Sequence, residues 1–184
     1  MSLGSQKKFL IIKLSALGDI VHALPVARTL RQAYPNAFIA WMIEERYQGL
    51  LHNNPDIDKI IPIRIKSWRK NLNREALKEI LKIIKNLRQQ NFDVVFDLHG
   101  LIKSGVIAML SGARIKSGFH RKNCKEKISS IFFNKKAPYM AGGIHVIDMY
   151  LTLVQSALEI QNKVKQFPLP EIRDQKVEDF FQHH

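Results

Sequence analysis

The carboxylate of Asp19 follows an apolar run and a short loop. Residues 10–14 have the composition of a buried parallel strand, and residues 20–34 that of a helix ending before Pro35. In open α/β sheets, ligands bind beyond the carboxyl ends of the strands, where helix N-termini converge. Asp19 is therefore a candidate general base for a bound hydroxyl, with its pKa lowered by the helix N-terminus. The alternative is that Asp19 only caps the helix, since aspartate is a favoured N-cap.

A second junction of this kind spans residues 97–104, with the sequence DLHGLIKS. Gly100 allows the backbone to approach a ligand closely, and Lys103 follows within reach of an anionic group. For Asp97, a cap at the strand end is the simpler interpretation. The sequence therefore predicts that both junctions border one ligand-binding edge.

Several classes of site are disfavoured by what the loops lack. The loop at residues 15–18 has one glycine, where a dinucleotide fingerprint needs three, and it lacks the Gly-Lys-Ser/Thr ending of a P-loop. A lone histidine such as His99 or His145 is more often packed or hydrogen-bonded than catalytic.

The single cysteine, Cys124, forms no internal disulfide and fits no zinc pattern, so we expect a buried, unreactive thiol in a reducing cytoplasm. No segment is apolar for long enough to predict a membrane span.

The formal net charge of +13 and a pI near 10 predict a surface that attracts polyanions. One basic group consists of Arg64, Lys66, Arg69, Lys70 and Arg74, with Trp68 among them. The other consists of Arg114, Lys116, His120, Arg121, Lys122, Lys125, Lys127, Lys135 and Lys136, opposed only by Glu126. Arginine matches phosphate and carboxylate geometry, so Arg69 and Arg121 are the favoured anion contacts.

Charge alone leaves nucleic acid, anionic lipid and phosphorylated glycan open as partners. A nucleic-acid-binding domain is disfavoured because aromatic residues do not alternate regularly with the basic ones, and no helix-turn-helix or zinc pattern is present. A solvated basic surface without a ligand is the simplest alternative. A domain that docks on acidic membrane lipids is a further one.

Strand-like and helix-like segments alternate along the chain, which predicts an α/β fold with a Rossmann-like parallel sheet and helices on both faces. We expect strands at 10–14, 38–43, 59–63, 94–98 and 114–119, and helices at 20–34, 44–51, 74–89, 101–110 and 145–160. Helical spacing predicts that the helix at 74–89 buries Leu77, Ile80, Leu81, Ile84 and Leu87. It predicts that the helix at 145–160 buries Val146, Met149, Leu153, Val154 and Ala157.

Three parts of the chain are predicted to differ in organisation. Residues 1–7 resemble a vector leader or a disordered end, and residues 8–166 form the Rossmann-like domain. Residues 167–184 begin with Phe-Pro-Leu-Pro, which cannot continue a helix. We expect this last part to be an interdomain connector, or the truncated start of a second domain.

Taken together, the junctions resemble glycosyltransferase family 9 over about residues 8–170. The strongest part is IIKLSALGDIVHALP at 11–25, and it is supported in order by WMIEE at 41–45, IPI at 61–63, WRK at 68–70 and DLHGLIKS at 97–104. The resemblance implies the N-terminal half of a GT-B glycosyltransferase, whose N-terminal domain binds the acceptor and whose C-terminal domain binds the ADP-heptose donor. It implies transfer of heptose to Kdo in the lipopolysaccharide inner core, with inversion at the anomeric carbon and Asp19 as the base.

The resemblance also implies roles for further residues. Acceptor contacts are expected from Ser15, Gly18, Lys66, Arg69, Lys70, Lys103, Arg121 and His145. Lys13 and Gly100 are expected to shape the cleft loops. No metal or cofactor is implied, because ADP-heptose is a substrate. The implied partners are Kdo2-lipid A and the anionic cytoplasmic face of the inner membrane. No specific nucleic acid is implied as a partner. The chain alone is predicted to be inactive, and a family 9 transferase that uses another sugar is the nearest alternative.

Overall fold

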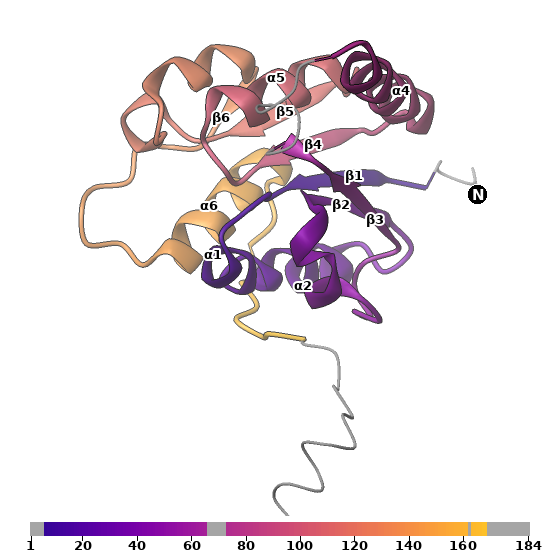
Figure 1. Cartoon of the computed structure of the whole chain (residues 1–184). Helices are drawn as coiled ribbons and strands as arrows, with labels where there is room; N and C mark the ends of the chain where they lie inside the picture. The colour runs from indigo at the N-terminus through magenta and orange to yellow at the C-terminus, as the bar shows by residue number, and fades with distance from the viewer. Residues whose placement is uncertain (1–5, 66–72, 162, 169–184) are drawn as a thin grey trace, which may run out of the picture.

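The computed structural model describes residues 6–65, 73–161 and 163–168 (Figure 1). Six parallel strands form one sheet in the order β3-β2-β1-β4-β5-β6. The strands are β1 Lys8–Ile12, β2 Phe38–Glu44, β3 Lys59–Ile63, β4 Val94–Asp97, β5 Ile115–Gly118 and β6 Lys135–Lys136. From β1 the chain first adds β2 and β3 on one side and then β4, β5 and β6 on the other. This is the topology of a doubly wound sheet, whose ligand crevice lies between β1 and β4, where the strand order reverses.

Helices cover both faces of this sheet, as the sequence predicts (Figure 1). One layer contains α1 Leu17–Val21, α2 Leu24–Ala33 and α6 Val146–Leu158, and the other contains α4 Arg74–Gln90 and α5 Ile102–Leu110. Three 3-10 helices complete the described regular structure: η1 Glu45–Leu51, η2 Arg121–Asn123 and η3 Lys127–Phe132. The Rossmann-like α/β fold class is therefore confirmed.

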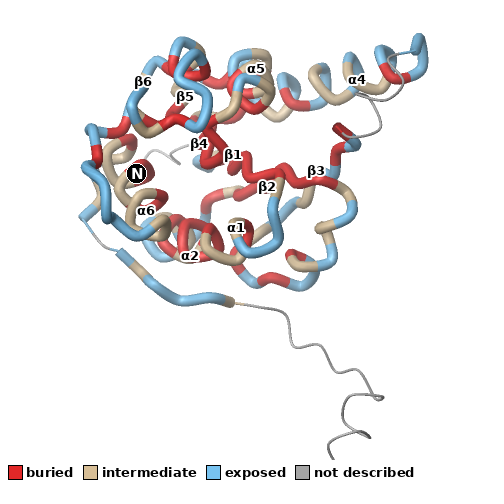
Figure 2. The backbone as a smooth tube through the Cα atoms, turned by 60° about the vertical axis from the view of Figure 1, so that its left-hand side comes forward, coloured by how far each residue is buried: buried red, intermediate tan, exposed pale blue. Residues whose placement is uncertain are grey.

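The core is centred on β1, which lies between β2 and β4 and is buried on both faces (Figure 2). Ile12 pairs with Met42 on one side and with Asp97 on the other. The pairing continues one residue further, because the Lys13 amide donates to the Met42 carbonyl at 3.2 Å and the Leu98 amide to the Ile12 carbonyl at 3.1 Å. This register places Lys13 and Leu98 together at the carboxyl edge of the sheet.

The single helix predicted over residues 20–34 is wrong, because two helices, α1 and α2, occupy this region. Pro25 lies in the first turn of α2. Proline has no amide hydrogen to continue a helix, and its ring clashes with the carbonyl four residues earlier, so it favours a new helix start. The first strand is also displaced from residues 10–14 to Lys8–Ile12.

The predicted apolar face of α4 is only partly correct. Leu87 is buried, but the side chains of Leu77 and Leu81 are 51% and 60% exposed. Ala76 is buried instead. Packing against the sheet therefore uses a narrower stripe of α4 than the spacing of its apolar residues suggests, and leucines remain on its outer surface.

The segment around α6 also differs in detail from the prediction. Leu153, Val154 and Ala157 are buried as expected, whereas Val146 and Met149 are half-buried. The helix buries two residues that the prediction omitted, Tyr150 and Leu151. The irregular basic stretch before it contains η2, η3 and the two-residue strand β6.

Gly118 at the end of β5 is expected to be essential for packing. An added Cβ there would overlap the ring of Phe133, which is itself buried. We therefore expect Gly118→Ala to lower the free energy of unfolding by about 2 kcal/mol, as overpacked cores do. Urea denaturation measures this, with Gly142→Ala as the matched control because an added Cβ at Gly142 meets nothing within 4 Å. Equal stability of the two variants would contradict this packing.

Candidate active site

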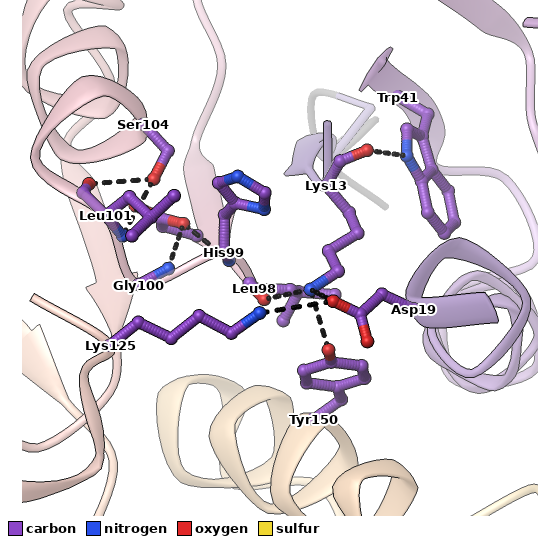
Figure 3. Close-up of polar contacts among 11 residues, drawn as sticks. Lys13, Asp19, Trp41, Leu98, His99, Gly100, Leu101, Ser104, Lys125 and Tyr150 are labelled. Carbon is purple, nitrogen blue, oxygen red and sulfur yellow. Dashed lines mark hydrogen bonds and ion pairs between the residues drawn. The ribbon is translucent and has the colours of Figure 1, made fainter. Parts of the chain in front are cut away.

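Asp19 lies just beyond the carboxyl end of β1, as the sequence predicts, but it does not cap the helix. The N-cap of α1 is Ala16, and Asp19 lies within the first turn. Its carboxylate Oδ2 is 3.3 Å from Nζ of Lys13 and 3.2 Å from Nζ of Lys125 (Figure 3). The side chain of Asp19 is 32% exposed, so it is both ion-paired and open to solvent.

Lys13 is the buried centre of this cluster, with a fully buried side chain. Its ammonium also donates to the carbonyl of Leu98 at 3.1 Å and to the hydroxyl of Tyr150 at 2.7 Å (Figure 3). The indole of Trp41 donates to the Lys13 carbonyl at 3.2 Å. Elements β1, β4 and α6 thus fix the ammonium, which in turn holds the carboxylate of Asp19.

The electrostatics of the cluster keep the Asp19 carboxylate ionised. Partial burial raises the pKa of Asp19, but Lys13 and Lys125 lower it more, so the pKa lies below its usual value. Burial lowers the pKa of Lys13 to about 8, against the opposing attraction of Asp19. Burial also raises the pKa of Tyr150. At neutral pH the arrangement is therefore a carboxylate between two ammonium groups, beside an un-ionised phenol.

The second junction is fixed by hydrogen bonds from the backbone to Asp97. Oδ1 of Asp97 accepts hydrogen bonds from the amides of His99 at 2.7 Å and Gly100 at 3.1 Å, so the predicted strand-end cap is confirmed. Gly100 has φ of 69°, which favours glycine, and its carbonyl accepts from the Glu126 amide at 3.0 Å. An added Cβ at Gly100 would lie 3.4 Å from the Lys125 amide nitrogen. This close approach brings Lys125 to Asp19.

His99 is a buried neutral histidine beside the cluster. Burial, together with the charges of Lys13, Lys103 and Lys125, lowers its pKa to about 3. Within the described part of the chain, neither ring nitrogen has a hydrogen-bond partner. His99 therefore adds no charge to the site at neutral pH.

The structure brings together only some of the predicted site residues. Ser15 is half-buried in the loop before α1, and Gly18 is exposed with open space around it. His145 caps α6 through Nδ1, which accepts from the Ile147 amide at 3.3 Å, and its ring packs edge-on against His22.

Lys103 is half-buried on α5, and Arg121 is exposed in η2. The predicted residues Lys66, Arg69 and Lys70 lie outside the described residues.

Two residues of the cluster were not among the predicted site residues: Tyr150 and Lys125. Tyr150 lies 137 positions from Lys13, and Lys125 lies 106 positions from Asp19. The available signal for Tyr150 was its helical spacing with Leu153, Val154 and Ala157, which assigns it to the inner face of α6. Among the described residues, no three His, Cys, Asp or Glu side chains gather in a way that could hold a metal ion.

Asp97 is expected to make stability depend on pH. Burial raises its pKa to about 6 in the folded chain, from 3.8. Between these values only the unfolded chain releases the proton, so Asp97 contributes a decrease of about 2 kcal/mol in the free energy of unfolding as pH rises from 4 to 6, against the increase that the buried, neutral His99 contributes over the same range. We expect this decrease to be absent in Asp97→Asn, whose Oδ1 still accepts the two amides. Urea denaturation at several pH values tests this, and an unchanged slope in the variant would contradict it.

The sequence profile described as glycosyltransferase family 9 (heptosyltransferase) matches residues 80–183, more than half of the chain. The chain belongs to glycosyltransferase family 9. Lipopolysaccharide heptosyltransferase 1 of Pseudomonas aeruginosa is 30% identical over 165 residues, covering 89% of this chain and 44% of the relative. The protein of the same name from Escherichia coli K12 is 30% identical over 130 residues, covering 70% and 41%.

Solved structures agree with this family membership. E. coli heptosyltransferase WaaC with ADP superposes with a TM-score of 0.78 at 27% identity, covering 86% of this chain and 49% of that one. The same enzyme with ADP-2-deoxy-2-fluoro heptose gives 0.79. The chain thus spans about half the length of the family 9 relatives that it matches.

Proposed function

We propose that this chain is the acceptor-binding half of an inverting heptosyltransferase, which transfers heptose from ADP-heptose to Kdo of the lipopolysaccharide inner core. The observation that carries the proposal is the Asp19 carboxylate between Lys13 and Lys125, at the sheet edge where α/β folds bind ligands. The names of the relatives, lipopolysaccharide heptosyltransferase 1, support the sugar and the pathway.

In the proposed reaction, Asp19 acts as the general base. A Kdo hydroxyl lies against the carboxylate, and its oxygen attacks the anomeric carbon of the donor while the bond to ADP breaks on the opposite face. The hydroxyl proton passes to Asp19, the oxygen keeps the electron pair that forms the new glycosidic bond, and ADP leaves as an anion. Because the two lysines lower the pKa of Asp19, it is a weak base, which suits a proton that leaves late.

The same lysines favour an anionic acceptor. Kdo carries a carboxylate and lipid A carries phosphates, and fixed cations bind both. Lys125, whose side chain is 59% exposed, is placed to contact such a group beside Asp19. We assign further acceptor contacts to Lys103 and Arg121 on the adjoining segments, and to Ser15, Gly18, Lys66, Arg69, Lys70 and His145 on the family resemblance.

The donor is proposed to bind outside these 184 residues, so that the chain alone does not turn over. The coverage of about half of each relative supports this division. Kdo2-lipid A is an amphiphile, so we place the reaction at the anionic cytoplasmic face of the inner membrane. Within the described residues, no helix is both long and apolar enough to cross a bilayer.

Chromatographic detection of ADP and glycan products tests this proposal. The chain is incubated with ADP-heptose and deacylated Kdo2-lipid A, beside an enzyme of full family length that carries these residues. We expect no ADP release from the chain, and an inverted heptosyl product from the longer enzyme. Turnover by the chain alone would overturn the division of substrates, and a retained anomeric configuration would overturn the mechanism.

A further inference from the structure

The 3-10 helix η3 presents isoleucines to solvent. Ile128 and Ile131 are 60% and 69% exposed, whereas Ser129 and Ser130 between them are buried. Side chains three residues apart eclipse each other in a 3-10 helix, so the two isoleucines share one face. The two exposed isoleucines therefore form a small apolar patch on η3.

Basic and aromatic side chains accompany this pair. Lys122 in η2 and Lys127 at the start of η3 are exposed. Tyr139 is 54% exposed, and Nζ of Lys122 lies over its ring, 5.3 Å from the ring centroid. The acid of this segment, Glu126, has its carboxylate engaged by the Ile102 amide at 2.6 Å. This segment therefore presents the cations of Lys122 and Lys127 together with the exposed side chains of Ile128 and Ile131.

This combination has the chemistry of a lipid interface. Apolar side chains enter the acyl boundary, a tyrosine lies at headgroup level, and lysines contact anionic headgroups. We propose that Lys122, Lys127, Ile128, Ile131 and Tyr139, named here the η2–η3 surface, dock on an anionic bilayer. Charge complementarity selects the bilayer over a second copy of this chain, whose formal net charge of +13 opposes self-association.

Lys125 connects the η2–η3 segment to the candidate active site. It lies between Lys122 and Lys127 in the sequence, and Nζ of Lys125 is 3.2 Å from Asp19 Oδ2. Docking through this surface would place Asp19 beside the headgroup layer, where a lipid-anchored acceptor presents its sugars. This consequence rests on the proposed function, whereas the docking itself rests on the exposed side chains.

Co-sedimentation with vesicles tests the docking without any acceptor. The chain is mixed with vesicles of phosphatidylcholine, with or without an equal amount of phosphatidylglycerol. We expect binding only to the anionic vesicles, weakened at least about tenfold by Ile128→Ser with Ile131→Ser. We expect Lys122→Glu with Lys127→Glu to weaken binding by more than about tenfold, since each lysine near an anionic surface contributes about fivefold.

The matched control is Leu77→Ser with Leu81→Ser, which removes a pair of similarly exposed apolar residues from α4. Binding that this control weakens equally would overturn the assignment to η2–η3, as would unchanged binding of the isoleucine variant or no vesicle binding by the natural chain. Circular dichroism verifies that each variant is folded. Binding of deacylated Kdo2-lipid A is measured on the same variants. A variant that still binds this glycan but no longer binds vesicles has lost docking alone, and the proposed function is then unaffected.

Discussion

Replacement of Asp19 by asparagine is expected to lower the rate of heptose transfer by about a thousandfold in an enzyme of full family length. The amide has the size of the carboxylate but cannot accept the hydroxyl proton, and general base catalysis contributes roughly a hundredfold to ten-thousandfold. Acceptor binding is expected to change by only a few-fold, because the two lysines remain in place. Initial rates of ADP release, with calorimetric acceptor titration, measure the two effects separately.

Asp148→Asn is the matched control for this prediction. Asp148 also lies in the first turn of a helix and pairs with a lysine, Lys165, at 2.8 Å, and that hydrogen-bonded lysine likewise lowers its pKa. It is outside the cluster around Lys13, so its replacement is expected to leave the rate nearly unchanged. If Asp19→Asn kept more than a tenth of the natural rate, or if both variants lost activity equally, Asp19 would not be the base.

Lys13→Met is expected to reduce transfer while increasing stability. Without the ammonium at 3.3 Å, the pKa of Asp19 rises and its carboxylate loses its fixed position, so we expect about a hundredfold loss of rate. Holding this lysine charged in the core at neutral pH costs about 3 kcal/mol, given its pKa of about 8 against 10.5. Loss of the hydrogen bonds to Leu98 and Tyr150 offsets about 1 kcal/mol each, which leaves a net gain of about 1 kcal/mol.

The pH dependence of stability gives the sharper test of this second prediction. Between pH 8 and 10.5 the unfolded lysine holds its proton and the folded one has released it, so the free energy of unfolding of the natural chain rises with pH. In Lys13→Met this rise should disappear. Urea denaturation at neutral and alkaline pH measures it, and a variant that is both less stable and equally pH-dependent would contradict the burial of a charged lysine here.

The sequence predicts the part of the fold that depends on local patterns. The apolar run before Asp19 indicates a central strand, and a carboxylate just after it must lie at the carboxyl edge of the sheet. The boundary at Pro25 is also present in the sequence, since a proline inside a helical pattern favours a new start, but the prediction of one helix over residues 20–34 does not use it.

The partners of Asp19 depend on tertiary packing that no local pattern contains. Tyr150 reaches Lys13 because α6 packs beside α2 in the same helix layer, and Lys125 reaches Asp19 because Gly100 lets the backbone at Cys124 and Lys125 approach closely. The exposed leucines of α4 have the same explanation. Periodicity predicts that Leu77 and Leu81 share a face, whereas the sheet decides how much of that face is covered.

Calorimetric titration of the purified chain with deacylated Kdo2-lipid A tests the central claim most directly, with ADP-heptose and a DNA duplex titrated in parallel. An acceptor-binding half predicts saturable glycan binding that Lys125→Ala weakens, little binding of ADP-heptose, and DNA binding that fades steeply with salt. Binding of DNA as strong as that of the glycan at moderate salt, or binding of ADP-heptose without the glycan, would contradict the account.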